Sequence, residues 1–183
     1  MSDFYWDSDR FEPHQGFGCL NRRKIQMADK IVYMSGPVRW AKVFDHNRDK
    51  GEYAPEGGQY TIDIGLDADD AKEVKKWNRL YTGKKDEKAG LTYFQFKRKH
   101  TAFKNDGELI EAWSGPPTVY DDEGNPWTVG LIGNDSVCTV KLAVNSVGSK
   151  TFVRLEGVRV DTLVPFEGGG PAVVENRSEG LPF

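Results

Sequence analysis

Alternation of apolar and polar side chains at every second position is the feature that most constrains this chain, because it requires extended strands with one buried face. The clearest case is QYTIDIGL at 59–66, where Tyr60, Ile62, Ile64 and Leu66 fall on one side. Other segments rich in β-branched and aromatic residues are 30–44, 91–103, 136–144 and 150–166. Turn-forming Gly, Pro and Asn separate these segments. The chain is therefore predicted to be mostly β, with five main strands.

The segment LTYFQFKRKHTAF at 91–103 divides into two faces by the same rule. Phe94 and Phe96 are expected to point into the core, and Arg98 and His100 share their side. The opposite side, expected to face solvent, carries Tyr93, Gln95, Lys97 and Lys99. This strand thus predicts a basic outer surface over an aromatic inner one.

One segment, 67–83, has helical spacing instead. Its apolar stripe consists of Ala71, Val74, Trp77 and Leu80. Asp67 can cap the first turn and Gly83 offers a stop, which predicts a helix of about four turns. Trp77 lies on the stripe and is predicted to be a core residue.

Two glycine-containing breaks indicate strongly bent strands. Gly36-Pro37 interrupts the first strand, and Gly157 within the last predicts a bulge. Residues 105–134 contain several Gly and Pro turns and are expected to form hairpin excursions. Bent strands favour a small closed β-barrel over a flat sandwich, with one helix between the second and third strands.

The chain of 183 residues is long enough for one domain with tails. We expect an N-terminal extension at 1–29, the folded domain at 30–166 and a flexible C-terminal tail at 167–183. No apolar run approaches the length of a membrane helix, so a membrane protein is not expected. The acidic start of the chain does not fit a signal peptide, and the two cysteines, Cys19 and Cys138, suit neither a zinc ribbon nor a disulfide framework.

Charge is segregated along the chain, although the net charge is only -3. Residues 84–104 contain seven basic residues and two acidic ones, whereas 105–125 hold acidic residues without a base. Aromatic rings interleave with the basic residues at Tyr93, Phe94 and Phe96. Cations interleaved with aromatic rings are typical of surfaces that bind single-stranded nucleic acid, although a basic solvated strand also explains the excess.

The sequence offers little for catalysis. Phosphate-binding, hydrolase-elbow and zinc-protease motifs are missing, and His14, His46 and His100 stand isolated. The acidic cluster at 121–123 reads as a tight turn. We therefore expect neither an enzyme nor a bound cofactor or metal.

The order of these elements resembles the single-stranded DNA-binding proteins that short-tailed bacteriophages encode for their own replication. The resemblance covers about residues 30–166 and rests on three pieces. These are IGNDSVCTVKL at 132–142, the FxF-basic strand at 94–99, and the terminal Phe183.

The resemblance implies a five-stranded OB-fold barrel that coats single-stranded DNA during replication, recombination and repair, often as a homodimer, in the cytoplasm of the infected bacterial host. It also implies a C-terminal tail that recruits replication proteins such as a polymerase, helicase or primase. The tail here is less acidic than those of the family. Its tip, Leu181, Pro182 and Phe183, looks like the apolar ending of bacterial single-strand binding proteins and is the expected partner-binding group.

In an OB-fold the central strand and two loops face the ligand. The expected DNA-binding residues are Trp40, Lys42, Phe44, Arg48, Lys50, Tyr53, Tyr93, Lys97, Lys99, Lys104, Lys141, Lys150 and Arg154. Lysines and arginines would pair with phosphates, while Tyr93, Trp40 or Phe44 would stack on bases with little sequence preference. Trp40, Lys42 and Phe44 are expected on one outward side.

Two other functions fit the same residues. One is a structural or adaptor protein whose barrel binds an acidic protein partner, and the other is a strand-annealing recombination factor. The aromatic-rich extension at 1–29 is expected to dock on the barrel or on a second subunit.

Overall fold

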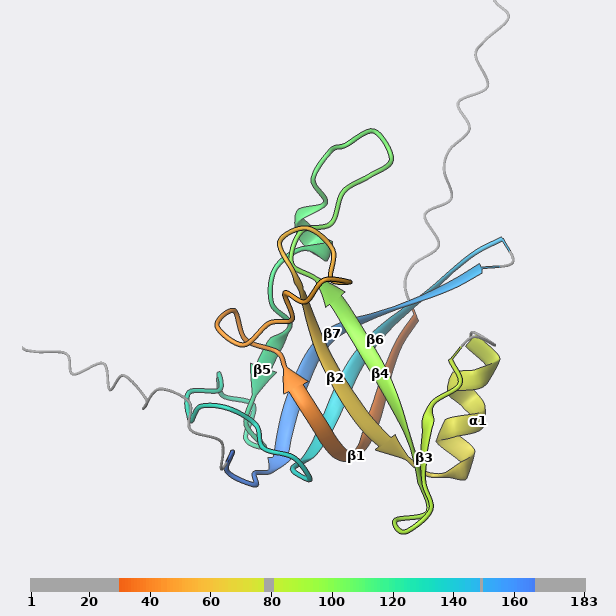
Figure 1. Ribbon diagram of the computed structural model, residues 1–183, viewed down its shortest axis with the longest axis vertical. Coiled ribbons are helices and arrows are strands. Elements are labelled where there is room, and N and C mark those ends of the chain that lie inside the picture. The colour runs from red at the N-terminus through yellow and green to blue at the C-terminus, as the bar shows by residue number, and fades with distance from the viewer. Residues whose placement is uncertain (1–29, 78–80, 149, 167–183) are drawn as a thin grey trace, which may run out of the picture.

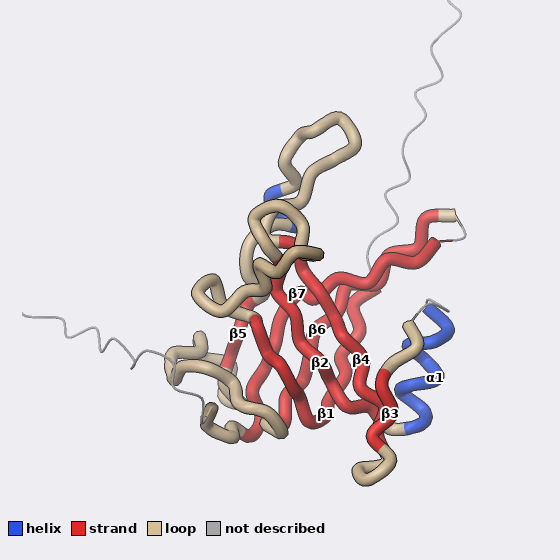
Figure 2. Tube along the Cα trace, viewed as in Figure 1, coloured by secondary structure: helices blue, strands red, loops and turns tan. Residues whose placement is uncertain are grey.

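The computed structural model describes residues 30–77, 81–148 and 150–166. Its elements are β1 Lys30–Lys42, β2 Gln59–Leu66, α1 Ala68–Trp77, β3 Lys84–Asp86, β4 Leu91–Lys99, the 3-10 turn η1 Glu111–Trp113, β5 Thr118–Tyr120, β6 Val137–Val147 and β7 Lys150–Thr162. The chain is mostly β with one α-helix, as predicted (Figure 2). The five expected strands are the five long ones, and β3 and β5 are short additions that the sequence did not indicate.

The strands form one curled sheet in the order β3-β4-β2-β1-β6-β7-β5 (Figure 1). The sheet bends round until β4 contacts β7. Among the described residues no ladder joins these two strands, so the closed five-stranded barrel predicted from the sequence is not what backbone hydrogen bonds form. All ladders are antiparallel except the one between β5 and β7.

Strand β1 is continuous through Gly36-Pro37, but it changes partners there. Residues 30–37 pair with β6, whereas Val38–Lys42 pair with β2. A Cβ at Gly36 would lie 2.1 Å from the Gly65 carbonyl oxygen, so only glycine allows β1 to cross β2 this closely. The expected bend is therefore confirmed as the point where one strand joins the two halves of the sheet.

The core fills the inside of this curl. Its largest fully buried side chains include Tyr60, Ile62, Phe94 and Phe96, as the alternation predicted. Strand β2 is buried on both faces rather than half-buried, because β1 and β4 flank it and their long side chains cover its outer positions.

Strand β4 reaches β7 through a side chain instead of a ladder. Arg98 is 8% exposed and donates to Glu156 Oε2 at 2.9 Å. Its guanidinium also donates to the carbonyl oxygens of Ala112, Ser114 and Gly115. The inward position predicted for Arg98 is confirmed, and this buried cation bridges the open side of the sheet.

Helix α1 packs beside the sheet through Ala71 and Val74, and Trp77 packs against the core as expected. Asp67 caps the helix, since its Oδ1 accepts from the Asp69 and Asp70 amides at 2.9 Å. The helix ends at Trp77 in the described part, and the predicted continuation through Leu80 lies outside it. No helix in the described ranges is long and apolar enough to cross a membrane.

Two further local features were predicted from the sequence, a bulge at Gly157 and a tight turn at the acidic cluster 121–123. A register shift in the β6–β7 ladder next to Gly157 confirms the predicted bulge. The turn at 121–125 is closed by the Asn125 amide, which donates to Asp121 Oδ1 at 2.7 Å. The predicted extension 1–29 and tail 167–183 lie outside the described residues.

Candidate nucleic-acid interface

The outer side of β1, β2 and β4 forms a surface that we call the basic face. The ladder register places Arg39, Asp63 and Gln95 in one row across three strands, and Lys42, Thr61 and Lys97 in the next. Gln95, Lys97 and Lys99 are exposed, while Phe94 and Phe96 lie behind them in the core. This confirms the predicted division of β4 into a basic outer and an aromatic inner side.

Lys97 and Lys99 give the basic face positive charge that the other described side chains do not neutralise. Neither makes an ion pair with any residue that the structure describes. Lys84 and Lys85 stand at the edge of the same surface on β3, which pairs with β4. Four ammonium groups therefore border one face of the sheet, where they can pair with phosphates.

Tyr93 belongs to this face but is covered. It is only 7% exposed, because the Arg39 guanidinium lies 4.3 Å from the centre of its ring. Gly65 makes room for the ring from below, since a Cβ there would approach Tyr93 Cζ to 2.9 Å. Burial also raises the pKa of the Tyr93 hydroxyl. The expectation that Tyr93 stacks directly on bases is therefore wrong, and the surface of the stack is Arg39 instead.

Arg39 is held in place by two carboxylates. Its Nη1 donates to Asp86 Oδ2 at 3.0 Å and its Nε donates to Asp135 Oδ1 at 3.2 Å. Hydrogen bonds to Asp135 and Asp86 raise the pKa of Arg39, and bonds from the Ala89 amide and Arg39 lower the pKa of Asp86. The guanidinium is thus held over the Tyr93 ring by two carboxylates and stays about one-third exposed.

Trp40 is the exposed aromatic residue of the basic face, with 65% of its surface accessible. It sits in a bulge, because Arg39 pairs with Asp63 and Lys42 with Thr61, so that β1 carries one residue more than β2 between these pairs. Its φ is 52°, a left-handed conformation that is rare outside glycine. The Trp40 amide donates to Asn134 Oδ1 at 2.9 Å, which holds the bulge.

The bulge changes which side chains of β1 face outward. Beyond it Ala41 and Val43 are buried, and Phe44 packs against the core and stacks on His46. The prediction that Phe44 shares an outward side with Trp40 is therefore wrong. Lys42 does face outward, but its ammonium pairs with Asp49 Oδ1 at 3.4 Å.

The segment IGNDS in the resemblance motif explains how the bulge is anchored. Asn134 and Asp135 hold Trp40 and Arg39, as described above. Ser136 closes the turn, since its Oγ donates to the Gly133 carbonyl at 2.8 Å and accepts from the Val164 amide at 2.9 Å. The motif thus holds Arg39 and Trp40 on the basic face, and its Asp135 carboxylate pairs with the Arg39 charge.

Two hollows mark the basic face between β1 and β3. Their volumes are about 390 and 280 Å³, and Asp63, Lys84 and Tyr93 line both. Asp63 accepts from Gln95 Nε2 at 2.9 Å, and Gln95 lines the smaller hollow. The basic face is therefore grooved, and its larger hollow is lined by Arg39, Lys84, Lys85 and Lys88 together with the acidic Asp86 and Glu87.

The first loop, residues 43–58, lies at the end of the basic face where β2 begins. Tyr53 is 94% exposed and Lys50 is exposed beside it, as a binding role requires. Arg48 is used within the loop instead, because its guanidinium donates to the carbonyl oxygens of Gly57 and Asp45. Arg48 thus helps to hold the shape of the loop, and its predicted contact with DNA stays a prediction.

The remaining predicted residues do not join the basic face. Lys104 pairs with Glu108 on the projecting hairpin. Lys141 lies on the outer side of β6, across the core from β2 and β4. Arg154 binds Glu156 and lies 4.8 Å from the centre of the Trp113 ring. Lys150 is exposed on the β6–β7 hairpin, which Figure 1 shows standing apart from the first loop.

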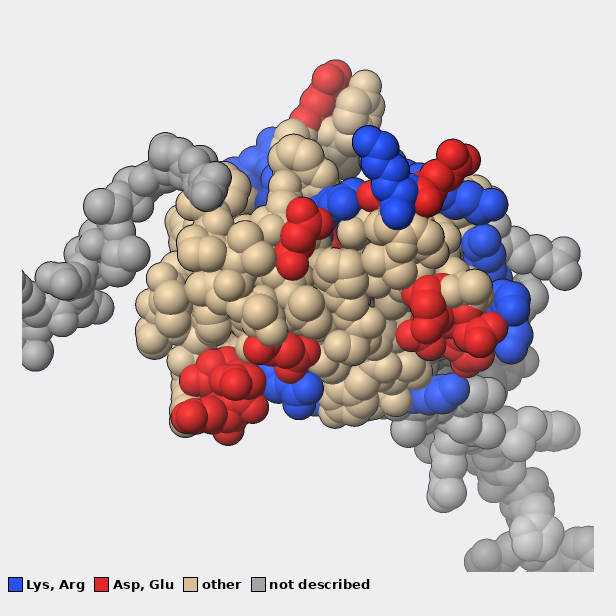
Figure 3. Space-filling view, turned by 90° about the horizontal axis from the view of Figure 1, so that it is seen from below, with Lys and Arg blue, Asp and Glu red and all other residues tan. Residues whose placement is uncertain are grey.

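The underside of the molecule has the opposite character. Seen from below, acidic side chains gather in separate clusters around a largely uncharged centre, and basic ones stay mostly at the rim (Figure 3). Such a surface repels phosphates, which leaves the basic face as the better candidate.

Sequence reasoning missed Arg39, Lys84 and Lys85 as members of this face, and it placed Gln95 there without a binding role. Arg39 and Gln95 follow the outward parity of their strands, so the alternation itself held that signal. The pairing of β3 with β4 had no local signal. The predicted partner-binding tip Leu181, Pro182 and Phe183 lies outside the described residues.

Comparisons with known proteins bear on the fold. The chain matches no protein-family model, and no curated protein sequence matches it. Among solved structures it resembles gp2.5, a single-stranded DNA binding protein encoded by bacteriophage T7, with a TM-score of 0.53 and 20% identity over 76% of this chain and 95% of that one. The single-stranded DNA-binding protein of bacteriophage Enc34, solved in complex with ssDNA, gives a TM-score of 0.48 and 11% identity over 75% and 89% of the two chains. The likeness to gp2.5 shows a shared fold.

Proposed function

We propose that this protein binds single-stranded DNA on the basic face and has no catalytic activity. The observation that carries the proposal is the exposed Trp40 ring of β1 on the same face of the sheet as Lys97 and Lys99 of β4, whose ammonium groups make no ion pair within the described residues. Aromatic rings that stack on bases, next to cations that follow the backbone, are the recurrent chemistry of single-strand binding. The fold shared with gp2.5, a protein named for this function, supports it.

Each group has a distinct part in this mechanism. Lys84, Lys85, Lys97 and Lys99 neutralise phosphates and release counterions. Trp40 stacks on one base, and the Arg39 guanidinium, which lies over the Tyr93 ring, offers a second platform. Because every base has a flat face, little sequence preference follows.

The biological role is part of the same proposal. An OB-fold protein of this kind coats single strands during replication and recombination of a bacteriophage genome in the host cytoplasm. The apolar tip Leu181-Pro182-Phe183 recruits a replication polymerase, helicase or primase. The basic face is positively charged, whereas the segment 167–183 has more acidic than basic residues. This difference supports DNA binding by the basic face and protein binding by the C-terminal segment.

Fluorescence titration of labelled oligonucleotides at two salt concentrations tests the DNA-binding function. Affinity for single strands should exceed affinity for duplex of the same sequence, because the rings need unpaired bases. The logarithm of affinity should fall with the logarithm of salt concentration by about 0.7 for each phosphate neutralised. Equal affinity for duplex, or binding that salt does not change, contradicts the proposal.

A protein-binding adaptor is the second candidate, and the projecting hairpin at 102–110 favours it. Phe103 and Leu109 pair across this hairpin, and both are exposed. Exposed apolar side chains on an arm are typical of contacts with another protein. Failure of the protein to be retained on an immobilised single strand at low salt would favour the adaptor.

A further inference from the structure

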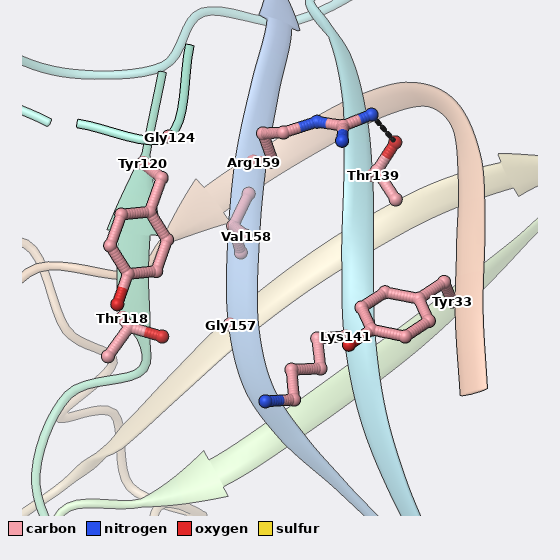
Figure 4. Close-up of a pocket in the computed structure, with 9 residues that line it drawn as sticks. All are labelled: Tyr33, Thr118, Tyr120, Gly124, Thr139, Lys141, Gly157, Val158 and Arg159. Atoms are coloured by element: carbon pink, nitrogen blue, oxygen red, sulfur yellow. Dashed lines mark hydrogen bonds between the residues drawn. The ribbon is translucent and has the colours of Figure 1, made fainter. Parts of the chain in front are cut away.

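A third hollow lies on the outer side of β6, β7 and β5, with a volume of about 350 Å³. Figure 4 shows Tyr33 and Tyr120 on opposite sides of β7 at Gly157, with the Lys141 side chain reaching from β6 toward the space between them. Strands β2 and β4 lie behind this sheet, so the hollow is on the other side of the core from most of the basic face. We call it the tyrosine slot.

The floor of the tyrosine slot is bare backbone. Gly157 faces Lys141 in the ladder, and a Cβ at this position would approach Thr118 Oγ1 to 2.8 Å. Any larger residue would therefore disturb the pairing with β5 and fill the space between the rings. Tyr33 remains 64% exposed, so its ring is open to a ligand.

Lys141 carries the uncommitted charge of the slot. No ion pair of Lys141 occurs within the described ranges. Arg159, by contrast, is bound to Asp161 Oδ1 at 2.7 Å and donates to Thr139 Oγ1. The slot thus combines two aromatic rings with one free ammonium, which suits a flat ring that carries a single anionic group.

Strand β1 connects this slot to the basic face. Tyr33, Ser35, Pro37 and Arg39 alternate with the buried Met34 and Val38, so they follow one another along the outer side of β1. The distance along the strand from Tyr33 to Arg39 is about 20 Å, at about 3.3 Å per residue. Asp161 borders this path, but Arg159 and Thr139 satisfy its carboxylate.

We infer that the tyrosine slot is an accessory subsite for a nucleotide of the same DNA strand that occupies the basic face. The base stacks on Tyr33 or Tyr120, the phosphate pairs with Lys141, and the strand passes between the two sites over β1. This inference rests on the proposed single-strand binding, and it adds that the protein covers more nucleotides than the basic face alone.

Oligonucleotides of two lengths separate the two sites. A short one of about 8 nucleotides fits a single OB-fold surface, whereas one of about 30 spans both sites. Exchanging Tyr33→Ala and Lys141→Ala together should weaken binding of the long oligonucleotide by about tenfold or more and leave the short one unchanged. The number of nucleotides covered per protein should fall, and the salt slope for the long one should drop by about 0.7.

Matched variants and a direct readout sharpen this test. Tyr33→Phe keeps the ring and should bind as the natural protein does, and so should Lys72→Ala on α1. Photocrosslinking of a long, iodouracil-substituted strand should give adducts at Tyr33 or Tyr120. Unchanged long-strand affinity in the double variant, or an equal loss for both lengths, overturns the inference. Failure of the natural protein to bind either oligonucleotide would instead refute the proposed function.

Discussion

At the scale of single residues, Trp40 combines two features that rarely coincide. Its backbone is left-handed, with φ of 52°, and its large ring is exposed. A left-handed conformation costs a non-glycine residue about 1 to 2 kcal/mol, and such costs are concentrated at functional sites. Asn134 satisfies the Trp40 amide and so helps to keep the ring on the basic face.

The exchanges Trp40→Ala and Trp40→Gly separate the ring from the backbone. Both should weaken single-strand binding by about 1 to 3 kcal/mol, because a stacking platform is lost. The glycine variant should unfold with a free energy about 1 kcal/mol higher than the alanine variant, because glycine accepts the positive φ. Oligonucleotide titration and urea unfolding measure the two effects. If both variants bound single-stranded DNA as tightly as the unaltered protein, Trp40 would not contact DNA.

Arg98 is the residue on which the open side of the sheet depends. Exchange Arg98→Met should destabilise the protein by about 3 to 5 kcal/mol, because Glu156 and several carbonyl oxygens lose their buried donor. Arg98→Lys should recover part of this loss, since it keeps the charge but cannot reach all acceptors. Thermal unfolding tests both. A melting temperature unchanged by Arg98→Met would mean that packing alone joins β4 to β7.

At the scale of elements, the two faces of β4 have different roles. Its inner side supplies aromatic rings to the core and its outer side supplies lysines to the basic face. The two halves of strand β1 have different partners, since the first half pairs with β6 and the second half with β2. The side chains that stabilise the core and those proposed to bind DNA are therefore different residues of the same strands.

Exchanges on the two faces of β4 should have opposite consequences. Lys97→Ala with Lys99→Ala should weaken DNA binding and reduce the salt slope by about 1.4, with little effect on unfolding. Phe96→Ala should lower the free energy of unfolding by about 3 to 5 kcal/mol, because it leaves a cavity in the core. Salt-dependent titration and denaturant unfolding check this pair. A Phe96→Ala protein of normal stability that no longer binds DNA would reverse the assignment of faces.

At the scale of the whole molecule, the curl of the sheet separates surfaces of different character. The basic face and the tyrosine slot lie on different sides of one core and are joined over β1. Acidic clusters occupy the underside (Figure 3). If the proposed single-strand binding holds, the charge distribution favours a DNA path along the basic face and β1 and disfavours one along the acidic underside.

Deletion of Leu181-Pro182-Phe183 addresses the proposed recruitment role. The truncated protein should bind oligonucleotides as well as the full chain or slightly better, because the acidic segment around these residues does not favour phosphates. Co-precipitation of a replication polymerase or helicase should be lost, because an apolar group within an acidic segment suits an apolar pocket edged by Arg or Lys. Markedly weaker DNA binding with normal recruitment would assign these residues to the DNA site.

Local periodicity was enough to determine the five long strands, the capped start of the helix, and the two faces of β4. An alternation or a cap is a property of neighbouring residues, so the sequence carries it directly. The register between strands is not local. It placed Arg39 over Tyr93 and Lys141 across the core from Lys97, and the chain beyond the end of β1 packs Phe44 against the core. Only the tertiary structure brings these partners together, because each contact joins residues that are far apart in the chain.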